Sequence, residues 1–214
     1  MGFNLYGAII LVSIIAGTVA ANVLGLRCGI KRRTLFYTAF FIFFSIVIFA
    51  VTFVFLGSGG KNIGVSGLGG VFGLMIGIIF SVYVHEDHPR ELFASWVISA
   101  PLMYSIAKVA CMTAGCCSGE LFGISVRIID CISYMLIYIA SLTLFIREDN
   151  KMRSAYTAMI LSFVARFVLD FFRDSHSGRV ISSEQIMILV AGGIAMSAYI
   201  LRKRIPLPKS ADNG

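Results

Sequence analysis

The sequence is poor in charged residues, which make up 14% of its 214 residues, whereas hydrophobic residues make up 58%. About a quarter of the residues in a typical soluble domain are charged, so this composition excludes an ordinary soluble protein. The polar–apolar alternation of β-barrel strands is also missing. Instead, the apolar residues fall in blocks long enough to cross a bilayer as helices, which requires about 20 residues. The predicted fold class is therefore an all-α integral membrane protein.

Two further absences concern the organisation of the chain. The first six residues contain no Lys or Arg, whereas a cleaved signal peptide begins with a basic region, so we expect the first apolar segment to be retained. No linker rich in Pro or Ser divides the chain, which has only four prolines. We therefore expect one polytopic transmembrane domain at 1–205 and a flexible cytoplasmic tail at 206–214.

About seven apolar segments are long enough to be transmembrane helices. We expect them at roughly 5–26, 35–56, 68–84, 92–111, 128–146, 155–172 and 185–201. The connections between them are short.

The basic residues predict the orientation of these helices, because cytoplasmic loops carry an excess of Lys and Arg. One set of alternating loops holds four basic residues, Lys61, Arg127, Arg173 and Arg179, and the other set holds twelve. The twelve are Arg27, Lys31, Arg32, Arg33, Arg90, Arg147, Lys151, Arg153, Arg202, Lys203, Arg204 and Lys209. We therefore expect the N-terminus outside and the C-terminus in the cytoplasm, in a membrane of the bacterial plasma-membrane type. The net charge of +7 then reflects topology and anionic headgroups, and no nucleic-acid partner is expected.

A first candidate site lies at the predicted outer end of the fourth span. It contains Lys108, Cys111, Gly115, Cys116, Cys117 and Gly119. The glycines break a helix and allow close approach of a ligand, and Lys108 can extend outward to a lipid phosphate. The alternatives are a loop with inert thiols, or a disulfide between Cys111 and Cys116 or Cys117 on an oxidising face. No metal site is expected, because His176 is the only histidine predicted on this face.

A second candidate site lies on the sixth span. Arg166, Asp170 and Arg173 are spaced to share one helix face, which would put a carboxylate between two guanidinium groups. Charged residues inside a span usually mark function, and Arg suits phosphate recognition. The alternative is a structural ion pair that fixes helix packing.

A third candidate is the glycine-rich segment 64–73, which leads into the third span. Small residues at this density commonly allow two helices to pack closely. A loop that holds phosphate is the alternative, and it would include Gly69 and Gly70.

Together these segments resemble the prolipoprotein diacylglyceryl transferase family. Ala107-Lys-Val-Ala-Cys-Met-Thr-Ala-Gly-Cys-Cys-Ser-Gly119 is similar to the family signature Gly-Arg-x-Gly-Asn-Phe-x-Asn-Gly-Glu-x-x-Gly, in a variant with Gly-Cys-Cys. Arg166-Phe-Val-Leu-Asp-Phe-Phe-Arg173 is similar to Arg-Phe-x-x-Glu-x-x-Arg. Ser182-Ser-Glu-Gln185 and Gly67-Leu-Gly-Gly-Val-Phe-Gly73 stand where the family has Ser-x-Gly-Gln and His-Gly-Gly-x-x-Gly.

The resemblance implies transfer of a diacylglyceryl group from phosphatidylglycerol to the lipobox cysteine of a prolipoprotein, without a cofactor. It implies catalytic roles for Cys116, Arg166 and Asp170. It also implies substrate binding by Lys108, Arg173, Gly69, Gly70, Cys111 and Gly119. Leu68 replaces the family histidine and Cys116 replaces the signature glutamate, so a thiolate would have to serve as nucleophile or base. The alternatives are an inactive homologue that binds an anionic lipid or a partner protein, and a thiol–disulfide membrane protein.

Overall fold

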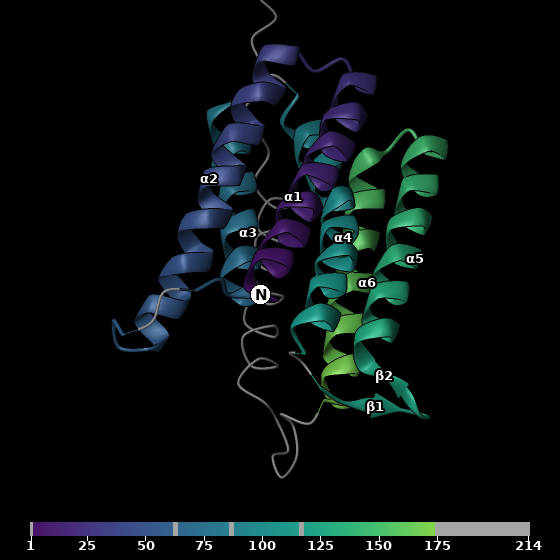
Figure 1. Ribbon diagram of the computed structural model, residues 1–214. Coiled ribbons are helices and arrows are strands. Elements are labelled where there is room, and N and C mark those ends of the chain that lie inside the picture. Colours follow the sequence, from purple (N-terminus) through teal and green to yellow (C-terminus); the bar gives the residue numbers. More distant parts are fainter. Residues whose placement is uncertain (1, 62–63, 86–87, 116–117, 174–214) are drawn as a thin grey trace, which may run out of the picture.

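The computed structural model describes residues 2–61, 64–85, 88–115 and 118–173, which form six long helices and one short β-hairpin (Figure 1). The helices are α1 (Gly2–Arg27), α2 (Arg32–Gly57), α3 (Gly67–Val84), α4 (Pro89–Ala114), α5 (Val126–Arg147) and α6 (Lys151–Asp170). The hairpin consists of β1 (Glu120–Leu121) and β2 (Ile124–Ser125) and connects α4 to α5. The seventh predicted span at 185–201 and the predicted tail lie outside the described residues.

All six helices are long and apolar enough to cross a membrane. This confirms a helical fold and indicates a multi-pass membrane protein. Six of the predicted spans correspond to these helices, and their predicted ends differ from the observed bounds by up to four residues. Helix α4 begins at Pro89 rather than at residue 92, because a proline is well suited to the first helical position. Helix α6 ends at Asp170 rather than at residue 172.

Helix α4 is the centre of the bundle, and it packs against α1, α5 and α6 (Figure 1). Its buried residues include Trp96, Ile98 and Ala94. Trp96 belongs to a core shared with α1, α2 and α3, whereas Ala94 and Ile98 pack with α5 and α6. Residues on α4 therefore join two groups of helices.

Glycines hold α3 close to α2. A Cβ atom at Gly73 would lie 2.5 Å from the carbonyl oxygen of Ser45 and 2.7 Å from the Cα of Ile46. The Ser45 hydroxyl donates a 2.7 Å hydrogen bond to the carbonyl oxygen of Gly73. A Cβ at Gly69 would overlap the α2 backbone at Phe49. This spacing of small residues is typical of close helix packing in membranes.

Replacing Gly73 by alanine should force α2 and α3 apart, because the obstructing atoms are backbone atoms that cannot rotate away. We expect a loss of about 1–3 kcal/mol in the free energy of unfolding, the usual cost of an overpacked contact. Unfolding of the detergent-solubilised protein measures it. Gly67→Ala is the control, since a Cβ there meets nothing within 4 Å. An equal loss in both variants would contradict the role of this contact.

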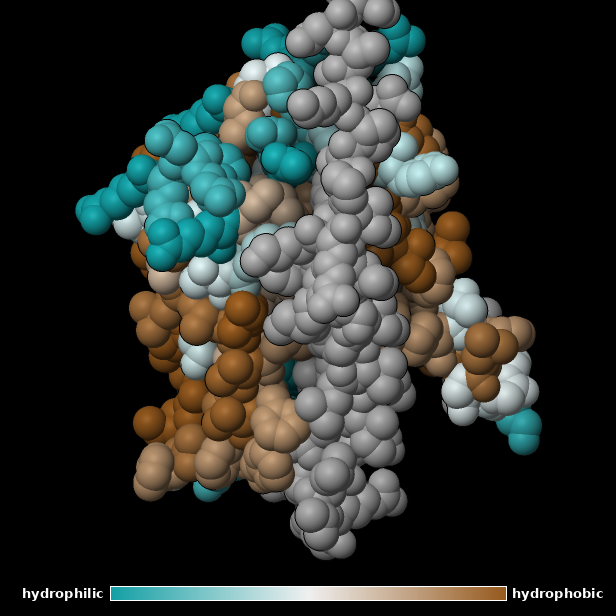
Figure 2. Space-filling model, turned by 180° about the vertical axis from the view of Figure 1, so that it is seen from behind, coloured by the Kyte–Doolittle hydropathy of each residue, from teal (hydrophilic) through white to brown (hydrophobic). Residues whose placement is uncertain are grey.

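The two ends of the bundle differ in polarity. Figure 2 shows hydrophilic side chains gathered at the upper end and a broad apolar surface below them. Exposed basic residues at the helix ends beside the α1–α2, α3–α4 and α5–α6 connections include Arg27, Arg32, Arg90 and Arg147. The β-hairpin and the C-terminal end of α6 lie at the opposite end (Figure 1).

Candidate functional site

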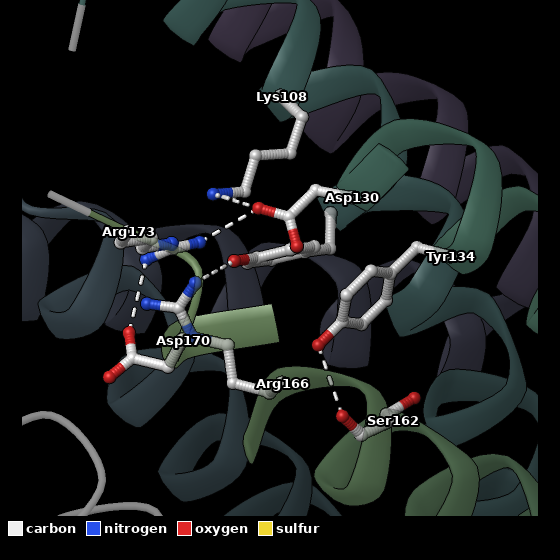
Figure 3. A network of polar contacts seen from close by, with 8 residues as sticks. Lys108, Asp130, Tyr134, Ser162, Arg166, Asp170 and Arg173 are labelled. Carbon is white, nitrogen blue, oxygen red and sulfur yellow. Dashed lines mark hydrogen bonds and ion pairs between the residues drawn. The ribbon is translucent and has the colours of Figure 1, made fainter. Parts of the chain in front are cut away.

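Charged side chains from three helices meet inside the end of the bundle that carries the β-hairpin (Figure 3). We call this set the charged cluster. It consists of Lys108 on α4, Asp130 on α5, Arg166 and Asp170 on α6, and Arg173 in the turn that follows α6. Two tyrosines, Tyr104 on α4 and Tyr134 on α5, pack beside them. The cluster therefore contains the predicted Lys108 and the predicted residues of the sixth span.

Asp130 is the centre of the charged cluster. One of its oxygens, Oδ2, lies 2.9 Å from the Lys108 ammonium and accepts a 2.7 Å hydrogen bond from the Arg173 guanidinium. The exposed fractions of Lys108, Asp130 and Arg173 are 4%, 0% and 5%. The other carboxylate oxygen of Asp130, Oδ1, has no hydrogen-bond partner among the described residues. One buried carboxylate thus joins a cation on α4 and a cation in the turn after α6.

The turn after α6 brings Arg173 back to the bundle. The backbone N–H groups of Phe171, Phe172 and Arg173 bond to carbonyl oxygens three residues earlier, which tightens the chain after Asp170. The Arg173 guanidinium lies 3.6 Å from the Asp170 carboxylate as well as beside Asp130. Our prediction that Arg173 shares a helix face with Arg166 is therefore wrong, because the helix ends before Arg173 is reached.

Burial opposes the charged form of Arg173, but Tyr104 and Asp130 outweigh this effect and raise the pKa of its guanidinium. Arg173 therefore keeps its positive charge. The same carboxylate that stabilises this charge also pairs with Lys108.

Arg166 reaches the cluster through Tyr104. Its guanidinium donates a 2.7 Å hydrogen bond to the Tyr104 hydroxyl and lies over the edge of the same ring, 5.8 Å from the centroid. The Tyr104 and Tyr134 rings are 4.2 Å apart, and the Tyr134 hydroxyl donates to the carbonyl oxygen of Ser162. Tyr104 thus positions Arg166 beside the ion pairs.

Lys108 does not extend outward as we expected. Its ammonium points to Asp130 and lies 5.0 Å from the centroid of the Tyr104 ring. In an apolar environment the carboxylate is a better partner than distant headgroups, because an unpaired buried charge is costly. Among the described residues, the charged cluster has three cations and two carboxylates.

Gly119 allows the hairpin to pack closely against the turn that carries Arg173. It is buried, its φ is +149°, and a Cβ there would overlap the carbonyl oxygen of Phe172 and come within 2.9 Å of the Cα of Arg173. Only glycine allows the hairpin to approach the turn after α6 this closely. Gly119 therefore contacts the backbone of Arg173.

An open pocket adjoins the hairpin. It has a volume of about 530 Å³ and is lined by Ser118, Gly119, Glu120, Ser125 and Arg127. Arg127 also donates a 3.2 Å hydrogen bond to the carbonyl oxygen of Gly115, at the end of α4. The pocket is polar, and Gly119 links it to the charged cluster.

The remaining predicted site residues lie elsewhere. The nearest atoms to Gly69 and Gly70 belong to α2 rather than to the charged cluster, and their predicted role in substrate binding stays a prediction. Cys111 is half-buried in the last turn of α4. Cys116, which we expected to be the catalytic thiol, lies outside the described residues, as do Cys117 and the segment Ser182–Gln185.

Asp130, Tyr104 and Tyr134 were missed by the sequence analysis. A signal for Asp130 was present, because it is the only carboxylate in the otherwise apolar segment 126–147, and ionisable residues in a span usually have a partner. The tyrosines gave no comparable signal. Among the described residues, no group of three or more His, Cys, Asp or Glu side chains could hold a metal ion.

Comparisons with protein-family models, with curated proteins and with solved structures gave no match for this chain.

Proposed function

We propose that this chain is a membrane transferase of the kind that its motifs resemble, which moves a diacylglyceryl group from phosphatidylglycerol to an acceptor thiol. In this proposal seven helices span a bacterial-type plasma membrane, with the N-terminus outside and the C-terminus in the cytoplasm. The acceptor is the lipobox cysteine of a prolipoprotein. One observation carries the proposal: Lys108, Arg166 and Arg173 converge from α4 and the end of α6.

Three cations at one end of the bundle suit the phosphate of an anionic phospholipid. Guanidinium groups bind phosphate oxygens through two parallel hydrogen bonds, and Arg166 and Arg173 supply two such groups from neighbouring positions. Lys108 adds a third positive charge. Asp130 and Asp170 hold Lys108 and Arg173 in place until the phosphate arrives.

The transfer forms one bond and breaks another. The acceptor sulfur attacks the glyceryl carbon that carries the phosphate ester, and the C–O bond to the phosphate breaks. The electron pair leaves with glycerol phosphate, whose developing charge the cations stabilise, which is commonly a large contribution to catalysis. The acceptor thiol must lose its proton, and Cys116 as a thiolate is the proposed base.

A second candidate function is binding of an anionic phospholipid without catalysis. The observation that favours it is the tight pairing of Lys108 and Arg173 with Asp130 in a fully buried position. Such an arrangement stabilises a fixed geometry and does not by itself supply a base.

Purified protein, labelled phosphatidylglycerol and a lipobox peptide distinguish the two functions. Lipidated peptide supports the transferase, whereas retention of phosphatidylglycerol without product supports binding alone. Replacement of Cys116 by alanine without loss of product would remove the proposed base.

Within this assay, Arg166→Lys should reduce product formation about 10- to 100-fold. The variant keeps the charge but loses the guanidinium fork, and one hydrogen bond to a charged group contributes about 1.5–3 kcal/mol. Arg153→Lys is the control on the same helix, since Arg153 is 74% exposed at the opposite end of α6. Equal rates for Arg166→Lys and the unmodified protein would contradict a role for Arg166 in phosphate binding.

A further inference from the structure

The β-hairpin between α4 and α5 has one polar face and one apolar face. Its register pairs Glu120 with Ser125 and Leu121 with Ile124. Successive residues of a strand point to opposite faces, so Glu120 and Ser125 share one face and Leu121 and Ile124 share the other. Glu120 and Ser125 line the polar pocket. The opposite face is apolar, and Ile124 is 50% exposed there.

The tip of the hairpin carries a large aromatic side chain in an unfavourable backbone conformation. Phe122 and Gly123 have φ values of +53° and +76°, as in the two-residue turns in which Asn-Gly or Asp-Gly is preferred. A bulky residue with positive φ is an outlier that usually reflects strain or function. Phe122 is 95% exposed, so packing within the described part of the chain does not account for a phenylalanine at this position.

The position of the hairpin indicates the environment of its exposed apolar face. It lies in the connection between α4 and α5, both long and apolar enough to span a membrane, and β2 runs directly into α5. The hairpin lies at that end of the bundle (Figure 1). The ends of spanning helices lie where hydrocarbon meets the headgroups, and Phe and Leu side chains are typical of the face that interfacial segments bury at that depth. An exposed Phe beside an exposed Ile matches this boundary.

We propose that Phe122 and the Leu121–Ile124 face insert into the headgroup boundary of the leaflet at this end of the helices. The Glu120–Ser125 face remains turned toward the polar pocket. Because Gly119 precedes the hairpin and contacts the backbone of Arg173, this insertion fixes the hairpin beside the charged cluster. The proposal depends on the helices spanning a membrane and is independent of the proposed reaction.

Tryptophan fluorescence in phosphatidylcholine vesicles tests the insertion. The chain has one tryptophan, Trp96, which is buried with an exposed fraction of 0%. Subtracting the emission of the unmodified protein from that of Phe122→Trp gives the emission of the added tryptophan. We expect this added emission to be blue-shifted, to be mostly lost when the lipids are brominated near the headgroup end of their chains, and to resist aqueous iodide. Added emission that iodide quenches and brominated lipid does not would overturn the proposal.

Glu120→Trp is the matched variant on the opposite face of the same hairpin. Iodide should quench its added emission, and brominated lipid should have little effect. Equal quenching of both variants by brominated lipid would contradict a two-faced hairpin.

Phe122→Asn separates membrane contact from a structural role. Asn tolerates positive φ better than Phe, so the unfolding temperature in detergent should be unchanged or higher. A lower unfolding temperature would mean that Phe122 stabilises the protein itself, which would overturn the proposal.

Discussion

Replacing Asp130 by asparagine should destabilise the protein more than any other single change in the charged cluster. Asparagine has nearly the same shape, so the variant removes the charge without creating a cavity. Lys108 and Arg173 would then keep their positive charges at 4% and 5% exposure without the carboxylate that both contact. Removing one partner of a buried ion pair typically costs about 3–5 kcal/mol.

Thermal unfolding in detergent, followed by the fluorescence of Trp96, measures this loss. For a protein of this size, the expected cost corresponds to a decrease in unfolding temperature on the order of 10 °C. The control is Glu148→Gln, which breaks a 3.2 Å ion pair with Arg153 whose side chains are 25% and 74% exposed. Exposed pairs contribute about 0–1 kcal/mol, so the control should remain close to the unmodified protein.

A second replacement identifies the cause of the loss. In the double variant Asp130→Asn with Lys108→Met, one of the two cations that contact the Asp130 carboxylate is absent, and Arg173 still lies 3.6 Å from Asp170. The double variant should therefore be more stable than the sum of the single losses predicts, as for residues in direct contact. Strict additivity would show that Lys108 and Asp130 do not interact.

Gly119→Ala should have the second-largest effect, because two separate costs act at one position. The backbone φ of +149° is unfavourable for any residue with a Cβ, at about 1–3 kcal/mol. The new methyl group would also overlap the carbonyl oxygen of Phe172, and overpacking costs a further 1–3 kcal/mol or so. To relieve the overlap, the hairpin or the turn that carries Arg173 must move.

Gly123→Ala isolates the backbone cost. Gly123 also has a positive φ, +76°, but a Cβ there meets nothing within 4 Å. We expect a larger loss of unfolding free energy in Gly119→Ala than in Gly123→Ala, because only the Gly119 variant adds a steric overlap. If both variants lose the same stability, Gly119 is required only for its backbone conformation and not to bring the hairpin against Arg173.

The sequence was sufficient to predict the helices because membrane spans leave a strong local signal. Six of the seven predicted apolar segments correspond to helices in the described part of the chain. The glycines of α3 were interpreted with two alternatives, and the contact of Gly73 with the backbone of α2 supports helix packing. These features depend on residues that are close together in the chain.

The charged cluster could be predicted only in part, because its contacts join distant segments. Arg166, Asp170 and Arg173 were grouped by helical spacing, but that spacing could not show that the helix ends at Asp170. Asp130 has no charged neighbour on its own helix that contacts it, and its partners lie on α4 and beyond α6. A single carboxylate in an apolar helix indicates that a partner exists without indicating where.

The pairing of Lys108 with Asp130 and Arg173 also affects how the protein enters the membrane. The ribosome makes α4 before α5 and α6, so Lys108 is synthesised before either carboxylate of the charged cluster. A lysine costs about 2.5–3.5 kcal/mol at the centre of a lone inserting helix, and less toward the C-terminal end of α4, where Lys108 lies. We therefore expect α4 to remain beside the insertion machinery until α5 and α6 have been made. The three helices would then enter the membrane together.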